Sequence, residues 1–160
     1  MNDYYPGIPR CYCGSYPHYY YQAPLPAERV SFHDEGKKPF VINIENAAIA
    51  NTTYRTALWT GKYLQATLMS IQVGDDIGLE RHEDHDQFLR IEQGQGMVEM
   101  GKAKNNLTFR RWVSNNSAIF VPAGFWHNVR NTGNTPLKLY SIYAPPEHPF
   151  GTVHQTKEDA

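Results

Sequence analysis

The sequence predicts an all-β fold, either a barrel or a sandwich, between Thr56 and Ala144. Short segments rich in β-branched and aromatic residues recur there about every 8–12 residues, and turns rich in glycine and asparagine separate them. The stretches between these segments leave no room for long helices, so the strands are expected to pack on one another. A chain of 160 residues is long enough for one such domain with extensions, and for a core that needs no disulfide.

The expected strands follow one another closely along the chain. In order, they are 62–73, 87–93, 97–100, 107–113, 117–123, 127–131 and 137–144. In the second of them, Leu89 and Ile91 share one face, because side chains alternate in a strand. Arg90 and Glu92 take the other face and are expected to point outward or toward a partner. The Gly-Gln-Gly turn after this strand predicts that it forms a hairpin with the strand that follows.

Residues 1–28 differ from the rest of the chain. They contain seven of the eleven tyrosines, five prolines and both cysteines, and they show no helical or alternating pattern. We expect an extended N-terminal arm that packs partly on the barrel or on a second subunit, because disordered tails seldom carry this much tyrosine. Cys11 and Cys13 are too close in sequence for an unstrained disulfide and too few for a structural zinc site, so free thiols are expected.

The remaining residues divide into a barrel and a tail. Residues 29–144 are expected to form the barrel, with a polar lead-in and, at 41–50, a short strand followed by a turn of helix. Residues 145–160 begin with prolines that end the last strand and are then expected to run back over the barrel, with space for a short final helix. His148 and His154 lie in this tail and are expected to face solvent, unless the tail covers the barrel mouth.

The composition of the chain indicates which binding partners and which cellular location to expect. The formal net charge is −1 and no basic stripe occurs, so nucleic acid is not an expected partner. No apolar run approaches the roughly 18 residues that span a bilayer, and the N-terminus lacks a signal-peptide pattern. We therefore expect a cytoplasmic protein that does not associate with membranes.

Two segments carry the residues that are suited to chemistry. The first, 74–94, contains two histidines, several acids and a glutamine close to a strand turn. Glu80 and His82 are two residues apart, so in an extended chain they point to the same side. The second segment, 116–131, runs through a Pro-Ala-Gly turn into a strand that His127 begins.

These two segments resemble the paired motifs of the cupin superfamily. The first family motif is a glycine, five residues, His-x-His, three or four residues, a glutamate, six residues and a glycine; the matching positions are Gly74, Glu80, His82, Gln87 and Gly94. The second is a glycine, five residues, Pro-x-Gly, two residues, a histidine, three residues and an asparagine; the matching positions are Asn116, Pro122, Gly124, His127 and Asn131. Asparagine at position 116 is compatible with the motif, because asparagine also adopts left-handed turn geometry.

The resemblance covers about residues 60–140 and implies a cupin barrel, a jelly roll also described as a double-stranded β-helix. The whole chain also looks like a group of small single-domain bacterial cupins that are loosely described as mannose-6-phosphate-isomerase-like. It also implies a metal site inside the barrel, with the ligands Glu80, His82, Gln87 and His127.

Two of these ligand positions depart from the family. Glu80 stands where the family has a histidine, and Gln87 stands where it has a glutamate, so the formal charge offered to a metal is unchanged. Two imidazoles and a carboxylate are typical of non-haem Fe(II) oxygenase sites, and Mn, Ni or Zn also suit these donors. Gln87 is a weaker donor whose alternative role is to hydrogen-bond a bound water or substrate.

Other residues near the motifs leave alternatives open. His85 could join His82 on one metal if the loop between them bends, although the family spacing favours His82. Trp126 precedes His127 and could line the rim of the barrel, but core packing is the preferred interpretation for it and for Trp112.

The leading functional hypothesis is a metal-dependent enzyme, dioxygenase-like or isomerase-like, that acts on a small organic molecule. Glu80 is the candidate catalytic base if it does not bind the metal. The alternative is a non-catalytic cupin that binds a small ligand or has a structural role in assembly. By analogy with the family, a homodimer is expected.

Overall fold

The computed structural model describes residues 32–160. The arm predicted for residues 1–28, with Cys11 and Cys13, lies outside the described residues. Within the described part, no helix has the length and the apolar character needed to cross a membrane.

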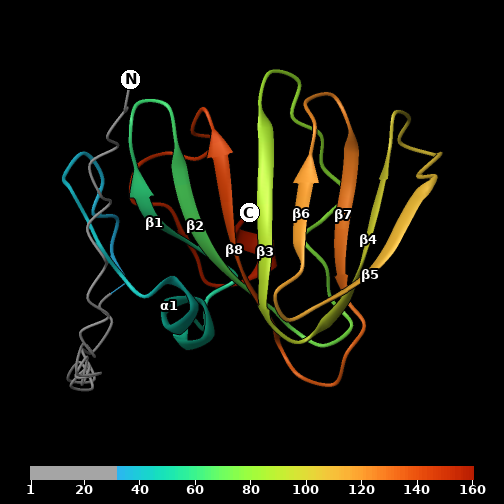
Figure 1. The fold of residues 1–160 in the computed structure, drawn as a ribbon, viewed down its shortest axis with the longest axis horizontal. Coiled ribbons are helices and arrows are strands. Elements are labelled where there is room, and N and C mark those ends of the chain that lie inside the picture. Colours follow the sequence, from blue (N-terminus) through green and yellow to red (C-terminus); the bar gives the residue numbers. More distant parts are fainter. Residues whose placement is uncertain (1–31) are drawn as a thin grey trace, which may run out of the picture.

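Residues 32–160 form two antiparallel sheets that enclose a jelly-roll barrel, as predicted (Figure 1). The larger sheet has six strands in the order β6 (Ala118–Val121), β3 (Asp86–Gln93), β8 (Leu137–Ala144), β2 (Gln65–Ile71), β1 (Arg55–Thr60) and β9 (Val153–His154). The smaller sheet has three strands in the order β5 (Phe109–Ser114), β4 (Gln95–Gly101) and β7 (Trp126–Asn131). All seven segments predicted as strands are therefore strands in the structure.

The predicted hairpin between the second and third of those segments is wrong. They are β3 and β4, and they belong to different sheets: β3 pairs with β8 and β6, whereas β4 pairs with β5 and β7. The chain changes sheet at Gly94, whose φ is +98° and whose missing Cβ would lie 3.1 Å from the carbonyl oxygen of Pro136. Glycine adopts this backbone conformation without strain, and the turn directs the chain from β3 in the larger sheet to β4 in the smaller one.

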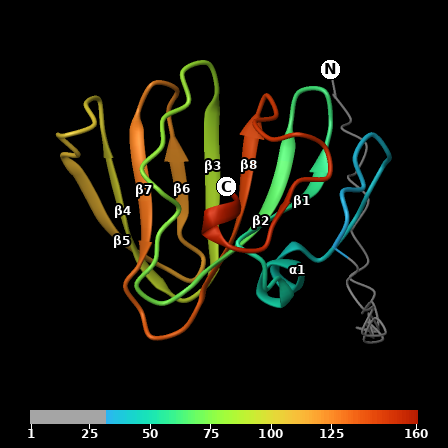
Figure 2. The ribbon, with the colours of Figure 1, turned by 180° about the vertical axis from the view of Figure 1, so that it is seen from behind.

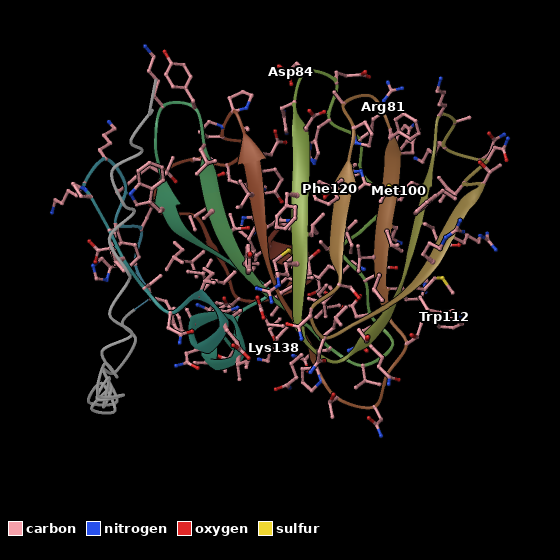
Figure 3. The ribbon with its side chains drawn as sticks, in the orientation of Figure 1. Arg81, Asp84, Met100, Trp112, Phe120 and Lys138 are labelled. Carbon is pink, nitrogen blue, oxygen red and sulfur yellow. The ribbon has the colours of Figure 1, made fainter. Side chains whose placement is uncertain are left out.

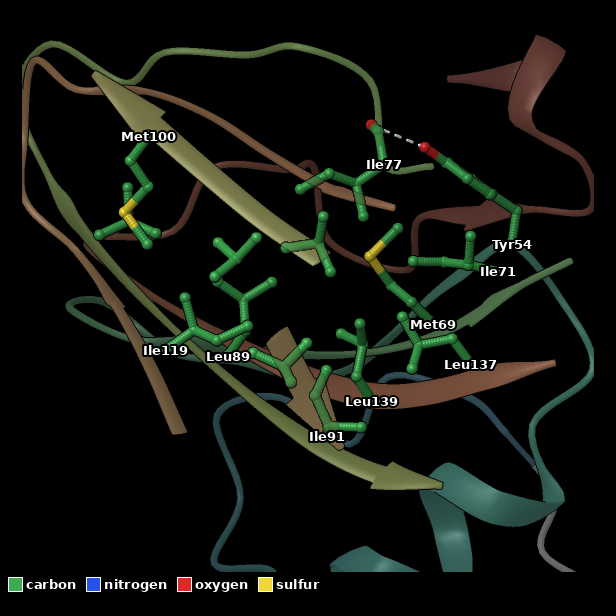
Figure 4. Close-up of a cluster of buried hydrophobic side chains, with 14 residues drawn as sticks. Tyr54, Met69, Ile71, Ile77, Leu89, Ile91, Met100, Ile119, Leu137 and Leu139 are labelled. Atoms are coloured by element: carbon green, nitrogen blue, oxygen red, sulfur yellow. Dashed lines mark hydrogen bonds between the residues drawn. The ribbon is translucent and has the colours of Figure 1, made fainter. Parts of the chain in front are cut away.

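The hydrophobic core lies between the two sheets (Figure 4). Leu89 and Ile91 of β3 and Leu137 and Leu139 of β8 are fully buried and point inward from the larger sheet. Burial of an aliphatic side chain of this size stabilises a fold by about 1.5–3 kcal/mol relative to exposure. The alternation that predicted an inward face for β3 is therefore confirmed.

A short helix, α1 (Ile44–Ala50), covers the other face of the larger sheet (Figure 1). The Asn43 side chain caps it by accepting a hydrogen bond from the amide of Asn46 at 3.0 Å. Ala47 and Ala48 are fully buried and pack with Leu58 and Leu68 of the sheet. The helical part of the prediction for 41–50 is confirmed, but the strand expected before it is absent from the described residues.

The outward position expected for Glu92 is also wrong. This residue is 4 % exposed and its carboxylate lies 3.2 Å from the guanidinium of Arg90. Burial raises the pKa of Glu92, and the neighbouring charge of Arg90 only partly opposes this. The alternation is correct, but α1 packs on the sheet face that the pattern assigned to solvent.

The chain after β8 returns along the barrel (Figure 2). β8 ends at Ala144, directly before two prolines. The following segment pairs with β1 through β9 and ends in a single 3₁₀ turn, η1 (Lys157–Asp159). We call residues 145–160 the C-terminal segment, and this segment brings a second group of polar side chains to the barrel.

Candidate metal site

The two sequence motifs meet through a direct backbone pair. Glu80 and His127 form an isolated antiparallel bridge in which Glu80 N donates to His127 O at 3.1 Å and His127 N donates to Glu80 O at 2.9 Å. Residues paired in this way carry their side chains on the same face, close together. The segment before β3 thus runs along β7 and brings Glu80 to His127, although they are 47 positions apart in sequence.

Three of the predicted ligands form what we call the inner cluster: Glu80, His82 and His127. The Oε1 atom of Glu80 lies 3.3 Å from Nε2 of His127 and 3.6 Å from Nε2 of His82. Donor atoms bound at about 2.0–2.2 Å to one metal lie roughly 3–3.5 Å apart, so these separations fit a shared cation. The His127 side chain is fully buried and that of His82 is 8 % exposed.

Both imidazoles have the orientation that metal ligands need. Nδ1 of His127 donates to the carbonyl oxygen of Phe125 at 3.1 Å. Its Nε2 faces Glu80, to which it donates when the ring is protonated, and it offers a lone pair to a metal when the ring is neutral. Nδ1 of His82 faces a carboxylate oxygen of Glu147 at 3.5 Å. A contact between the outer nitrogen and an oxygen acceptor fixes the tautomer of a ligating histidine.

Gln87 occupies the inward face of β3, in step with Leu89. Its cross-strand partner is Tyr143, whose ring centroid lies 5.7 Å from that of His82. The Gln87 amide donates from Nε2 to the hydroxyl of Ser141 at 2.9 Å. This bond leaves Oε1 buried and without a hydrogen-bond partner among residues 32–160.

All four predicted ligands share one feature. In the described part of the chain, each presents a buried donor atom that makes no hydrogen bond; these atoms are Oε1 of Glu80, Nε2 of His82, Oε1 of Gln87 and Nε2 of His127. A buried polar atom without a partner costs about 1–3 kcal/mol, so such atoms are rare in native proteins. Residues 32–160 contain thirteen such side-chain atoms, and four of them belong to the residues that the two motifs align, as expected for a bound cation.

Electrostatics in the inner cluster favour an ionised carboxylate. Burial would raise the pKa of Glu80, but contacts with the imidazoles of His127 and His82 outweigh it and hold the pKa at about 2. Burial would lower the pKa of His82, but the adjacent Glu80 carboxylate outweighs it and places this pKa above 6.5. Burial raises the pKa of Tyr143 to about 12, so its hydroxyl stays protonated beside the cluster.

A second group of ligand-type side chains, the outer cluster, consists of His82, His85 and Glu147. The rings of His82 and His85 are stacked with centroids 4.5 Å apart, and Nε2 of His85 lies 3.3 Å from Oε2 of Glu147. Sequence reasoning offered His85 as an alternative ligand but missed Glu147. No motif spacing includes position 147, so the motifs could not have identified Glu147. The one sequence signal for it was the expectation that the tail after the two prolines runs back over the barrel.

The solvent-exposed position expected for His148 is wrong. Its ring packs edge-on against Tyr143 with centroids 5.1 Å apart, and burial lowers its pKa to about 4. His154, in β9, is half-buried, and its ring centroid lies 6.3 Å from that of His148. The C-terminal segment therefore covers part of the barrel end that holds the site.

Two of the three tryptophans lie at the barrel rim and on the outer surface. Trp126 is half-buried at the start of β7, with the guanidinium of Arg81 at 5.2 Å and the ammonium of Lys104 at 5.3 Å from its ring. Figure 3 shows Arg81 and Asp84 at the end of the barrel where β3 begins. Trp112 is 73 % exposed on β5, so the core-packing interpretation is wrong for this residue.

The backbone at the motif positions agrees with the resemblance. Asn116 has φ +68°, the left-handed conformation that a glycine would otherwise supply, and Gly124 has φ +79°. Asn131 is buried and its amide donates to the carbonyl oxygens of Ile71 and Thr135 at 2.9 and 2.8 Å. This asparagine therefore ties the end of β7 to the neighbouring sheet.

Comparison with known proteins agrees with the fold and the motifs. Residues 67–143 match the Cupin domain family model. The uncharacterized protein YrkC of Bacillus subtilis strain 168 is 69 % identical over 127 residues, which cover 79 % of this chain and 68 % of YrkC. The chain belongs to the cupin family. An uncharacterized protein of Acanthamoeba polyphaga mimivirus is 37 % identical to this cupin over 115 residues, covering 71 % of this chain and 70 % of the viral protein.

A solved structure extends the likeness to three dimensions. The crystal structure of BH2720 from Bacillus halodurans matches this cupin with a TM-score of 0.79 and 62 % sequence identity. The match covers 79 % of this chain and 96 % of BH2720. The barrel described above is therefore shared with a protein of known structure.

Proposed function

We propose that this cupin binds a divalent transition metal through Glu80, His82 and His127, with Gln87 as a fourth, neutral donor, and acts as an enzyme on a small organic molecule. The observation that carries the proposal is the set of four buried donor atoms without hydrogen-bond partners in the described residues. Iron, manganese, nickel and zinc all accept imidazole and carboxylate donors, so the donor set is compatible with each of them.

In such a site, the role of the protein is to hold the metal and to orient its ligands. The fixed contacts at Nδ1 of His127 and His82 direct their Nε2 atoms to the same point as the Glu80 carboxylate. A bound divalent cation supplies Lewis acidity, which polarises an oxygen atom of a substrate. Tyr143, protonated and buried beside His82, offers a hydroxyl that donates to an oxygen of a molecule in the barrel.

The role of Glu80 as a general base is the weaker of its two candidate roles. A base works best when its pKa lies near the working pH, whereas the imidazoles hold the pKa of Glu80 at about 2. A carboxylate that stays ionised in a buried site is better suited to hold a cation. Two imidazoles and one carboxylate favour a dioxygenase-like reaction over an isomerase-like one.

The enzyme proposal is tested by turnover. Protein stripped with a chelator is reloaded with Fe(II), Mn(II), Ni(II) or Zn(II) and incubated with small organic acids, phenols and sugars. Oxygen uptake and proton NMR spectra report conversion. We expect one metal form to convert a substrate, with loss of conversion in the stripped protein and in His127→Ala, and retention in His33→Gln, which replaces an exposed imidazole outside both clusters. A protein that holds stoichiometric metal and converts nothing would contradict the enzyme proposal.

A second candidate function, a non-catalytic role in binding or assembly, is supported by exposed aromatic side chains. Trp112 and Phe120, both labelled in Figure 3, are 73 % and 72 % exposed, and Phe109 is 44 % exposed. They lie on β5 and β6 at the edges of the two sheets and line one groove. Exposed apolar groups gathered in this way are typical of contact surfaces. A homodimer through this surface is expected to dissociate in Trp112→Ser with Phe120→Ser, measured as molar mass in solution. An unchanged molar mass would remove this surface from assembly.

A further inference from the structure

The outer cluster has the features of a site in its own right. Its three ligand atoms come from the loop before β3 and from the C-terminal segment, and they all lie within 4.8 Å of one another. The His85 side chain is 4 % exposed, and its Nε2 atom has no hydrogen-bond partner within residues 32–160. A buried imidazole nitrogen without a partner, facing a carboxylate, is a donor available for a cation.

The two clusters differ in their access to solvent. In the outer cluster, the Glu147 side chain is 36 % exposed. Nδ1 of His85 lies 3.0 Å from a carboxylate oxygen of Asp84, and the Asp84 side chain is 85 % exposed. In the inner cluster, the Glu80 side chain is 25 % exposed and that of His127 is fully buried. A hydrated cation can therefore exchange its water for protein ligands at the outer cluster before it reaches the inner one.

His82 belongs to both clusters. Its Nε2 atom faces Glu80 in the inner cluster, and its Nδ1 atom faces Glu147 in the outer cluster. A neutral imidazole has one lone pair and one proton on its two nitrogens, so it serves one cluster at a time. When the cation is on Nδ1, the proton is on Nε2 beside the Glu80 carboxylate; when the cation is on Nε2, the proton is on Nδ1 beside the Glu147 carboxylate.

From this geometry we infer that the outer cluster is a second, weaker divalent-metal site that captures the cation at the barrel mouth and delivers it to the inner cluster through His82. This inference rests on the proposed metal function of the inner cluster. Because both clusters share the His82 ring, the inference predicts that the protein holds one cation rather than two at saturation. It also assigns a function to His85, which the inner cluster does not use, and a second function to Glu147, which otherwise only orients His82.

The kinetic test follows metal loading of the full chain. Stripped protein is mixed with Co(II) in a stopped-flow instrument, and visible absorbance reports the rate and the final extent of binding. The variants are His85→Phe, which keeps an aromatic ring against His82, and Glu147→Gln, which keeps a hydrogen-bond acceptor for Nδ1 of His82. Glu158→Gln, at an exposed carboxylate of the same segment, is the control.

We expect both variants to load about tenfold more slowly, because each lacks one ligand of the outer cluster, and to reach the same final affinity and stoichiometry as the wild type, because neither residue is a ligand of the inner cluster. Loading at the wild-type rate in both variants would overturn the inference. A Glu147→Gln protein that loads at the normal rate but binds more weakly would show instead that Glu147 only orients His82, which also overturns it.

The equilibrium test separates this inference from the proposed function. In His127→Ala, we expect weak binding of one Co(II) that disappears when His85→Phe is added. Residual binding that survives the second substitution would place the cation elsewhere and overturn the outer site. A wild-type protein that binds no Co(II) would overturn the proposed function itself, whereas tight wild-type binding with no dependence on His85 would overturn the inference alone.

Discussion

The side chain of Gln65 holds the backbone of His148 through two hydrogen bonds. Nε2 of Gln65 donates to the carbonyl oxygen of His148 at 2.8 Å, and the amide of His148 donates to Oε1 of Gln65 at 2.9 Å. Gln65 is fully buried, at the start of β2. This pair anchors the C-terminal segment directly after Glu147, so the position of Glu147 depends on the sheet.

Replacement of Gln65 by leucine tests this anchor. Gln65→Leu removes both hydrogen bonds, together with the one that Nε2 donates to the hydroxyl of Thr60 at 2.9 Å, and leaves backbone groups of His148 unpaired. This is expected to lower the free energy of unfolding by about 1–3 kcal/mol. Urea denaturation measures the effect. The control is Gln72→Leu, at an exposed glutamine just after the same strand, and we expect it to change stability little. Equal stability of Gln65→Leu and the wild type would contradict the anchor.

Gln87 offers a test of the altered ligand position. Gln87→Glu returns the carboxylate that the family has there and places a second negative charge at the inner cluster, so metal affinity is expected to rise. Gln87→Leu removes the donor and is expected to lower affinity by about 10–100-fold. Titration with Zn(II) against a chelator of known affinity measures both. Unchanged affinity in both variants would show that Gln87 does not contact the metal.

A charged contact joins the C-terminal segment to the loop that leads to Glu80. The Lys157 ammonium lies 2.7 Å from a carboxylate oxygen of Asp75 and 2.5 Å from one of Asp76. Burial would raise the pKa of Asp76, but contacts with Lys157, Asn128 and the amide of Gly78 outweigh it, so the pKa lies below 3.8. The contribution of Asp76 to stability is therefore full above about pH 4 and is lost as the pH falls through its lowered pKa.

This contact predicts a pH-dependent stability difference. Because water screens a partly exposed pair, Asp76→Asn is expected to lower the free energy of unfolding by about 0.5–1 kcal/mol at pH 7. The difference between variant and wild type should shrink below pH 4, because the Asp76 carboxyl of the unfolded chain then binds a proton before the folded one does. Denaturation of both proteins at pH 7 and pH 3, with Lys157→Met in a double-mutant cycle, measures it. A difference that stays constant between these pH values would contradict the assignment.

The left-handed residue before β6 gives a prediction about the backbone. Asn116→Ala is expected to cost about 1–2 kcal/mol, because alanine disfavours φ +68°. Asn116→Gly should be close to neutral, since glycine adopts this conformation freely and the lost contact with Arg90 is exposed. Thermal unfolding of the two variants tests the order. Equal stability of the alanine and glycine variants would show that backbone conformation does not limit this position.

The parts of the fold that sequence reasoning recovered depend on local rules. Alternation in 87–93 placed Leu89 and Ile91 in the core, and the motif spacing selected Glu80 and His127, which the structure joins through a backbone bridge. Turn geometry explained the asparagine at position 116. Each of these depends on residues near one another in sequence or on a fixed spacing.

The parts that it missed depend on packing between distant segments. Glu147 meets His82 across 65 positions, and no local pattern predicts that contact. Glu92 alternates as a surface residue should, but α1 packs on that sheet face. The hairpin prediction treated a glycine turn as a reversal within one sheet, whereas Gly94 sends the chain to the other sheet.

The most direct test of the central claim is the metal content of the protein purified without chelators, measured by elemental mass spectrometry. The proteins compared are the wild type, Glu80→Gln, His82→Ala, His127→Ala and the control His33→Gln. We predict about one divalent transition metal per chain in wild type and control, and a large loss in the three inner-cluster variants. Wild-type protein that contains no metal and takes up none from Fe(II), Mn(II), Ni(II) or Zn(II), or inner-cluster variants that keep full occupancy, would contradict the account.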